Sequence, residues 1–286
     1  MRKTLITIST LLVAVAVIAQ QTQQSQAPQV KYPRPSQKSS LMQTIGTTDM
    51  TITYSRPGVK GRQIWGALVP YDKVWRTGAN EATTISFSDD VSINGQSLPK
   101  GTYSLHTIPG RDSWTLIFNK VADQWGSFNY DQSKDQLRVT ATPQKAPFTE
   151  WFTFEVPQLT ADRATVQLRW ENLAVPFTVD TGSTTKTLSA ARAAITSAAA
   201  GDWRTPYRAA GFALDNGNVD DAATWADQAA KANENINTLY LKARVAAKRG
   251  QKADAIRYGE MAVAKAGPND TELAGEIRAD LANWRK

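Results

Sequence analysis

The composition of the chain changes abruptly near Gly182, and this change divides it into two kinds of structure. Before it, from about Leu41, short stretches rich in Thr, Val, Ile and aromatic residues alternate with Gly, Pro, Asn and Asp, a pattern typical of β-strands and turns. After it, 27 of the 102 residues from Thr185 to Lys286 are alanine, which indicates closely packed helices. We therefore expect an antiparallel β-domain over residues 41–182, followed by an all-α domain over residues 185–286.

The β-domain contains eight candidate strands. They are Met50–Tyr54, Thr83–Phe87, Thr102–Ile108, Ser113–Asn119, Leu137–Ala141, Trp151–Val156, Thr165–Trp170 and Val175–Val179. The pair Asn94-Gly95 tolerates positive φ at both central positions of a turn, so it predicts a tight hairpin between the short apolar stretches on either side. Short antiparallel strands at this spacing favour a sandwich or a barrel.

The alanine-rich part contains an internal repeat. Thr205 recurs as Thr238, and several of the surrounding residues recur with the same offset. The stretch from Arg249 to Ala262 resembles the second half of a tetratricopeptide repeat, so each copy is predicted to be a helix hairpin. Because two units are fewer than a free-standing solenoid needs, we expect Leu188–Ala200 and Thr271–Trp284 to be additional helices that cap the pair.

The first residues have the three parts of a secretory signal peptide. Arg2 and Lys3 form a basic start, Leu5–Ala19 is apolar, and Ala19 suits cleavage. The apolar stretch is shorter than the ~20 residues that span a bilayer. We therefore expect a signal peptide over residues 1–19, a periplasmic or secreted product, and no membrane span after cleavage. Residues 20–40, rich in Gln, Ser, Pro and Lys, are predicted to be a disordered linker.

The composition excludes several functional classes. With no Cys and a single His, the chain has no disulfide and no zinc site built on those ligands, and we expect neither a metal nor a cofactor. The net charge of +7 is spread without a basic stripe, which argues against a nucleic-acid partner. The sequence assigns no catalytic residue. His106, the only histidine, is open to a role as a general base or to a structural role in its strand.

An aromatic-rich connection in the β-domain gathers the best candidates for a binding site. Arg76 offers a planar fork for carboxylate or phosphate, Glu81 can accept hydrogen bonds from hydroxyls, and Trp75 can stack on a ring. In a structural alternative, Arg76 pairs with Glu81 or another carboxylate, Asn80 closes a turn, and Trp75 belongs to the core. Arg62 can add charge to the same place. The sequence leaves both interpretations open.

A longer set of motifs surrounds this connection. The motifs are Lys60-Gly61-Arg62, Ile64-Trp65-Gly66, Leu68-Val69-Pro70-Tyr71, Val74-Trp75-Arg76-Thr77-Gly78-Ala79-Asn80-Glu81-Ala82-Thr83, Gly101-Thr102-Tyr103-Ser104-Leu105, Ile108-Pro109-Gly110, Trp114-Thr115-Leu116-Ile117-Phe118-Asn119 and Gln124-Trp125-Gly126. Together they resemble the domain of unknown function 2911 family over roughly residues 41–179. The resemblance implies an exported bacterial protein with a β-domain and a helical-repeat tail. It implies no particular activity.

Two functions are compatible with these features. The first is an exported, non-enzymatic protein that binds a protein or peptide in the groove of its tetratricopeptide-like helix hairpins, because stacked hairpins leave a concave face. The second is a small-molecule or carbohydrate-binding β-domain, with hydrolysis left open, that uses Arg62, Trp75, Arg76, Asn80 and Glu81. We expect binding rather than catalysis.

Overall fold

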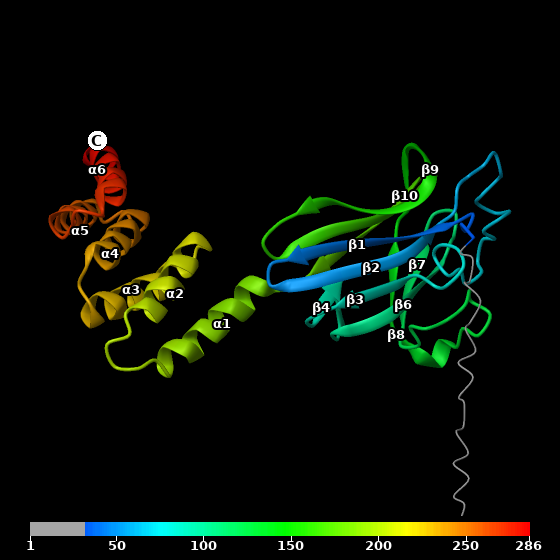
Figure 1. The fold of residues 1–286 in the computed structure, drawn as a ribbon, viewed down its shortest axis with the longest axis horizontal. Helices are drawn as coiled ribbons and strands as arrows, with labels where there is room; N and C mark the ends of the chain where they lie inside the picture. Colours follow the sequence, from blue (N-terminus) through cyan, green and yellow to red (C-terminus); the bar gives the residue numbers. More distant parts are fainter. Residues whose placement is uncertain (1–31) are drawn as a thin grey trace, which may run out of the picture. The chain divides into compact units, whose positions relative to one another are not determined.

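The computed structural model describes residues 32–286, which form two β-sheets followed by helices (Figure 1). The predicted signal peptide and most of the predicted linker lie outside these residues. The ten strands of the described part are β1 (Gln37–Ile45), β2 (Thr48–Arg56), β3 (Thr84–Phe87), β4 (Val91–Ile93), β5 (Gln96–Leu98), β6 (Gly101–Ile108), β7 (Trp114–Asn119), β8 (Asp135–Ala141), β9 (Gln144–Leu159) and β10 (Arg163–Asp180). Its six α-helices are α1 (Ser183–Thr196), α2 (Arg204–Asp215), α3 (Val219–Ala232), α4 (Ile236–Lys248), α5 (Lys252–Ala264) and α6 (Thr271–Arg285).

The strands form two antiparallel sheets that share one hydrophobic core. One sheet has the order β1-β2-β3-β6-β7-β8 and the other has the order β5-β4-β10-β9. Leu105 and Phe118 of the first sheet belong to the same buried cluster as Phe152 and Trp170 of the second. Inward-facing residues of both sheets thus fill the space between them, as in a β-sandwich. The predicted fold class, an antiparallel β-domain followed by helices, is confirmed.

Three strands differ most from the sequence-based expectation. β1 was not among the predicted strands, β9 has 16 residues where Trp151–Val156 was predicted, and β10 joins two predicted strands. β1 begins at Gln37, inside the stretch that we predicted as a linker up to Ser40, and it pairs along its whole length with β2. β10 is one strand of 18 residues where two shorter strands were predicted. Glu171 and Asn172, which lie between the two predicted strands, do not end β10. Glu171 adopts φ +55°, and the pairing with β9 shifts register on either side of it and then continues. Such bulges bend a strand without breaking it.

The local turn and helix signals agree with the structure. Asn94 and Gly95 have φ angles of +47° and +81° and join β4 to β5, as the predicted hairpin requires. The repeat forms two helix pairs, α2 with α3 and α4 with α5, and Thr238 near the start of α4 closes a capping box with Asn235. Fully buried Ala210 and Ala222 lie in the core shared by α2 and α3, where small side chains permit a close approach. No helix within residues 32–286 is long and apolar enough to cross a membrane.

Two long connections lie against β6 and build the candidate site. The first runs from β2 to β3 and contains Trp75, whose backbone N–H and C=O bond to Thr107 at 2.7 and 2.9 Å. The second runs from β7 to β8. The connections are joined to each other by Ala82 N–H to the Gln124 carbonyl at 2.9 Å and by Gly126 N–H to the Asn80 carbonyl at 3.1 Å.

Candidate functional site

The segment from Arg76 to Thr83 is a closed turn, here called the elbow. The Thr83 N–H donates to the Arg76 carbonyl at 3.1 Å, and the Thr83 hydroxyl donates to the Thr77 carbonyl at 2.6 Å. Gly78 has φ +156°, and a Cβ at this position would lie 3.0 Å from the Ser55 carbonyl oxygen. Only glycine fits this backbone without strain. The elbow is therefore a specific structure held by its own backbone and by two buried threonines.

Trp75, just before the elbow, packs with the aromatic residues of the core. Its ring stacks on Trp170 with centroids 6.0 Å apart and meets Trp65 and Trp114 edge to face. Its indole N–H donates to the Gly78 carbonyl at 3.2 Å. These contacts agree with the structural alternative for Trp75, and the half-buried residue also lines the hollow that contains Arg76.

Arg62 and Asn80 hold backbone segments in place. The exposed Arg62 donates from Nε to the Val59 carbonyl at 3.1 Å and from Nη2 to the Gly58 carbonyl at 2.5 Å. Asn80, at φ +59°, donates from Nδ2 to the Ser36 carbonyl at 3.0 Å. The sequence grouped both residues with Arg76, but neither of them lines a hollow beside the elbow.

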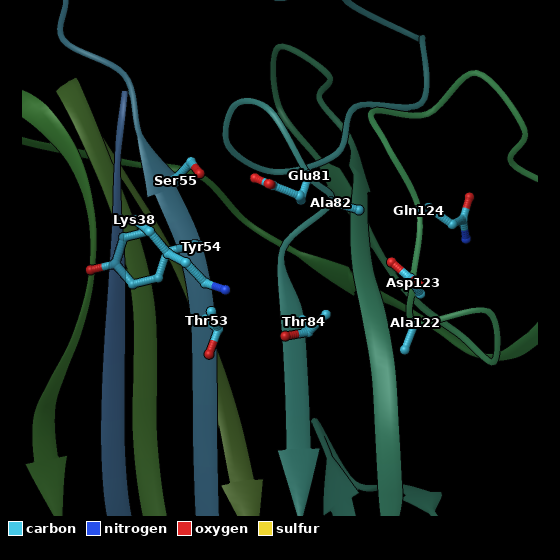
Figure 2. A pocket seen from close by; sticks show the side chains of 10 residues that line it. All are labelled: Lys38, Thr53, Tyr54, Ser55, Glu81, Ala82, Thr84, Ala122, Asp123 and Gln124. Carbon is cyan, nitrogen blue, oxygen red and sulfur yellow. The ribbon is translucent and has the colours of Figure 1, made fainter. Parts of the chain in front are cut away.

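Glu81 lines a hollow of about 250 Å³ on one side of the elbow (Figure 2). The hollow lies beyond the last paired residues of β2 and β3, Thr53 and Thr84, where the chain leaves the ladder. In Figure 2 the Glu81 carboxylate points toward Ser55, and Asp123 comes from the connection after β7. The lining residues are Lys38, Thr53, Tyr54, Ser55, Glu81, Ala82, Thr84, Ala122, Asp123 and Gln124. Hydroxyls, two carboxylates and one amine thus share this space.

Arg76 lines a different hollow, of about 300 Å³, together with Lys73, Ser127, Phe128 and four further residues of the first connection. Two cations and no carboxylate lie in this lining. Among residues 32–286 the half-buried Arg76 side chain has no hydrogen bond or ion pair, and its Nε is buried without a partner. Burial lowers the pKa of the Arg76 guanidinium, which nevertheless stays charged because arginine does not lose its proton in proteins.

A buried polar cluster lies behind this hollow, on the face of β6 opposite Leu105. His106 is completely buried, and its Nδ1 lies 3.2 Å from the Ser127 hydroxyl. Burial lowers the pKa of His106 to about 4, against a smaller opposite effect of Asp135, so the imidazole is neutral at pH 7. Tyr130 donates to Asp135 Oδ2 at 2.6 Å, and burial together with this hydrogen bond raises the pKa of Tyr130.

The family comparison covers this whole arrangement. The family described as a protein of unknown function, DUF2911, matches residues 36–179, half of the chain. The chain belongs to the DUF2911 family. The matched DUF2911 domain contains both hollows, the elbow and nearly all of the sandwich, and it ends before the helices. No curated protein and no solved structure matches the chain.

The Ser127–His106 pair of the DUF2911 domain does not have the geometry of an activated nucleophile. In a catalytic serine–histidine pair, a third group holds the other ring nitrogen and stabilises the imidazolium that forms. Here Nε2 of His106 is buried and has no partner in the part of the chain that the structure describes, and the low pKa opposes protonation of the ring. Within residues 32–286, no group of three or more acidic or histidine side chains is arranged to hold a metal ion.

Sequence reasoning missed Ser127 as a site residue of the DUF2911 domain. Alternation along β6 places His106 opposite Leu105, but it does not tell which segment covers that face. The cover is the connection between β7 and β8, which was part of the family pattern only as Gln124-Trp125-Gly126. The useful signal was Gly126. It has φ +70°, and a Cβ there would lie 3.5 Å from Nη1 of Arg76, so the backbone passes directly over the guanidinium.

Proposed function

We propose that this chain is an exported binding protein whose DUF2911 domain holds the anionic group of a small ligand at Arg76. The observation that carries the proposal is a half-buried guanidinium that has no counter-ion among residues 32–286. A charge removed from water is normally paired, and an unpaired one weakens the fold. A cation that the protein does not neutralise itself is suited to an anion that arrives from solution.

The chemistry of the hollow fits a carboxylate or a phosphate. The planar fork of Arg76 can bind two oxygens of either group at once, and the ammonium of Lys73 adds a second positive charge. Leu68 and Phe128 are 46% and 81% exposed, so apolar surface is available beside the charge. The volume of about 300 Å³ is at the lower end of the range for ligand pockets. We therefore propose a small ligand with one anionic end and an apolar body.

Calorimetric titration of the mature chain with benzoate and with inorganic phosphate tests this proposal. Arg76→Gln removes the charge and should weaken binding by about tenfold or more, the usual loss for a hydrogen bond to a charged group. Arg62→Gln removes an identical charge from an exposed side chain whose hydrogen bonds within the described residues go to the Val59 and Gly58 carbonyls, and it should bind like wild type. Equal losses in both variants, or no binding by wild type at millimolar concentrations, would contradict the proposal.

We also propose that the helices bind a protein or peptide, as tetratricopeptide repeats do. The repeated pairs α2 with α3 and α4 with α5 support it. The hollow beside α4 supports it less, because Lys242 there already binds Asp227 at 2.7 Å and lies 4.3 Å above the Tyr258 ring. Affinity capture with the mature chain and with a chain lacking residues 185–286 tests this proposal. Equal recovery of partners by both would remove it.

A further inference from the structure

The hydroxyl of Ser127 lies between the buried His106 and the hollow that contains Arg76. Its only hydrogen bond among residues 32–286 is the 3.2 Å contact with Nδ1 of His106, and Ser127 also lines the hollow. Either atom can be the donor in this contact. The direction of the bond therefore decides whether Ser127 offers a hydrogen atom or a lone pair to a ligand.

The other nitrogen of His106 decides that direction. A neutral imidazole carries one hydrogen, on Nδ1 or on Nε2. If it were on Nε2, a buried N–H would have no partner, since Nε2 has none in the described part of the chain. Such orphaned N–H groups are rarer in proteins than orphaned acceptors. The Tyr130 ring, 5.3 Å away and tilted by 57°, is at best a weak acceptor.

With the hydrogen on Nδ1, only a lone pair is left unpaired and Nδ1 donates to the Ser127 oxygen. The hydrogen of the Ser127 hydroxyl is then left for a ligand. Arg76 and Lys73 are also donors without any acceptor capacity. The polar side-chain groups of the hollow therefore all act as donors, which matches an ionised oxyanion and disfavours a ligand group that must itself donate.

We infer that His106 is a positioning residue whose Nδ1–H tautomer makes Ser127 a hydrogen-bond donor, so that the Arg76 hollow selects ionised carboxylate or phosphate groups. The selectivity rests on the proposed function. The tautomer does not rest on it, because it follows from the contact of Nδ1 with Ser127 and from a buried Nε2 that has no partner among residues 32–286.

The tautomer can be read directly because His106 is the only histidine in the chain. A long-range proton–nitrogen correlation spectrum of the ¹⁵N-labelled mature chain, prepared without a histidine tag, contains one imidazole. At neutral pH we expect Nδ1 to have the shift of a protonated ring nitrogen and Nε2 that of an unprotonated one. The reverse assignment would overturn the inference, and if anions still bind, the proposed function would survive it.

Binding of benzoate and inorganic phosphate to matched variants tests the positioning role. In His106→Asn the amide Nδ2 takes the place of Nδ1 as a donor, whereas His106→Leu has a similar branched shape without a donor. Ser127→Ala should weaken binding by about tenfold and His106→Leu by about two- to tenfold, while His106→Asn should stay close to wild type.

Two results of these titrations would overturn the inference. One is wild-type affinity in folded Ser127→Ala. The other is equal loss in His106→Asn and His106→Leu when both melt like wild type. If the two His106 variants fail to fold, the nitrogen spectrum of wild type and the anion affinity of Ser127→Ala still test the inference. A wild-type chain that binds no anion overturns the selectivity together with the proposed function.

Discussion

Replacing Arg76 with methionine should leave the ligand-free protein as stable as wild type or make it more stable. A buried donor without a partner costs about 1–3 kcal/mol, and within residues 32–286 Nε of Arg76 is such a donor. Because the side chain is only half-buried, solvent still reaches part of the guanidinium, so we expect about half of that cost, roughly 0.5–1.5 kcal/mol, to be recovered. Methionine keeps an unbranched apolar stem in the same place.

The opposite result is expected if Arg76 is held in a buried ion pair. Removing one partner of such a pair destabilises a protein by about 3–5 kcal/mol. The two interpretations therefore differ in sign. For a unit of 150–250 residues, 1 kcal/mol shifts the melting temperature by about 2–4 °C, so we expect a rise of about 1–6 °C in scanning calorimetry of the protein. A clear fall in melting temperature would refute the unpaired state of Arg76.

Arg56→Met is the matched control for this experiment. Arg56 is also partly buried, but its Nε donates to the Phe152 carbonyl at 3.0 Å. The same substitution there removes a formed hydrogen bond, and we expect it to lower the melting temperature. With saturating benzoate or phosphate, the melting temperature of wild type should rise further, because a ligand stabilises the state that binds it, and Arg76→Met should not respond.

Three further predictions concern residues around the site and the fold. Trp75→Ala should cost about 3–5 kcal/mol in calorimetry because the ring belongs to the core; an unchanged melting temperature with lost binding would favour a stacking platform instead. Gly46→Ala should lower the free energy of unfolding by about 2–5 kcal/mol, since the residue has φ +61° and a Cβ would lie 2.5 Å from the Ala161 carbonyl oxygen. Gly61, at φ +67°, has open space around it, so Gly61→Ala should show only the part of this loss that comes from the positive φ angle. The pKa of His106 falls from 6.5 to about 4 on folding, so the unfolded chain binds more protons between these values and stability should fall as pH drops from 6.5 to 4. The loss reaches about 3 kcal/mol. In His106→Phe, denaturant titrations across this range should lack that loss, and equal pH profiles for the two proteins would contradict the burial of a neutral imidazole.

The parts of the fold that the sequence predicted correctly are those set by local rules. The hairpin at Asn94-Gly95 follows from the φ angles that these two residues tolerate. The helix pairs follow from a repeat in which each copy forms the same local structure. The sequence predicts two strands, Thr165–Trp170 and Val175–Val179, where pairing with β9 carries one strand, β10, through register shifts around Glu171. Tertiary pairing outweighed local propensity there.

The site could be located from the sequence but not assembled from it. Arg76 and Glu81 are five positions apart in a polar segment, and this proximity suggested either a shared site or an ion pair. The structure places them in the linings of two different hollows. Asn80 at φ +59° and Gly78 at φ +156° determine the path between them. A connection without periodic structure contains no pattern from which such backbone angles could be read.

The path of the elbow contributes to the separation of these two charges. Backbone bonds from Ala82 to Gln124 and from Gly126 to Asn80 fix the Glu81 end of the turn against the connection between β7 and β8. A flexible segment of the same sequence would let Arg76 and Glu81 pair, because two opposite charges so close along a chain attract each other. The closed turn instead places the two side chains in the linings of different hollows, and among residues 32–286 the guanidinium beside Ser127 has no partner. The elbow forms when the domain folds, so the proposed anion would not have to order the site on binding.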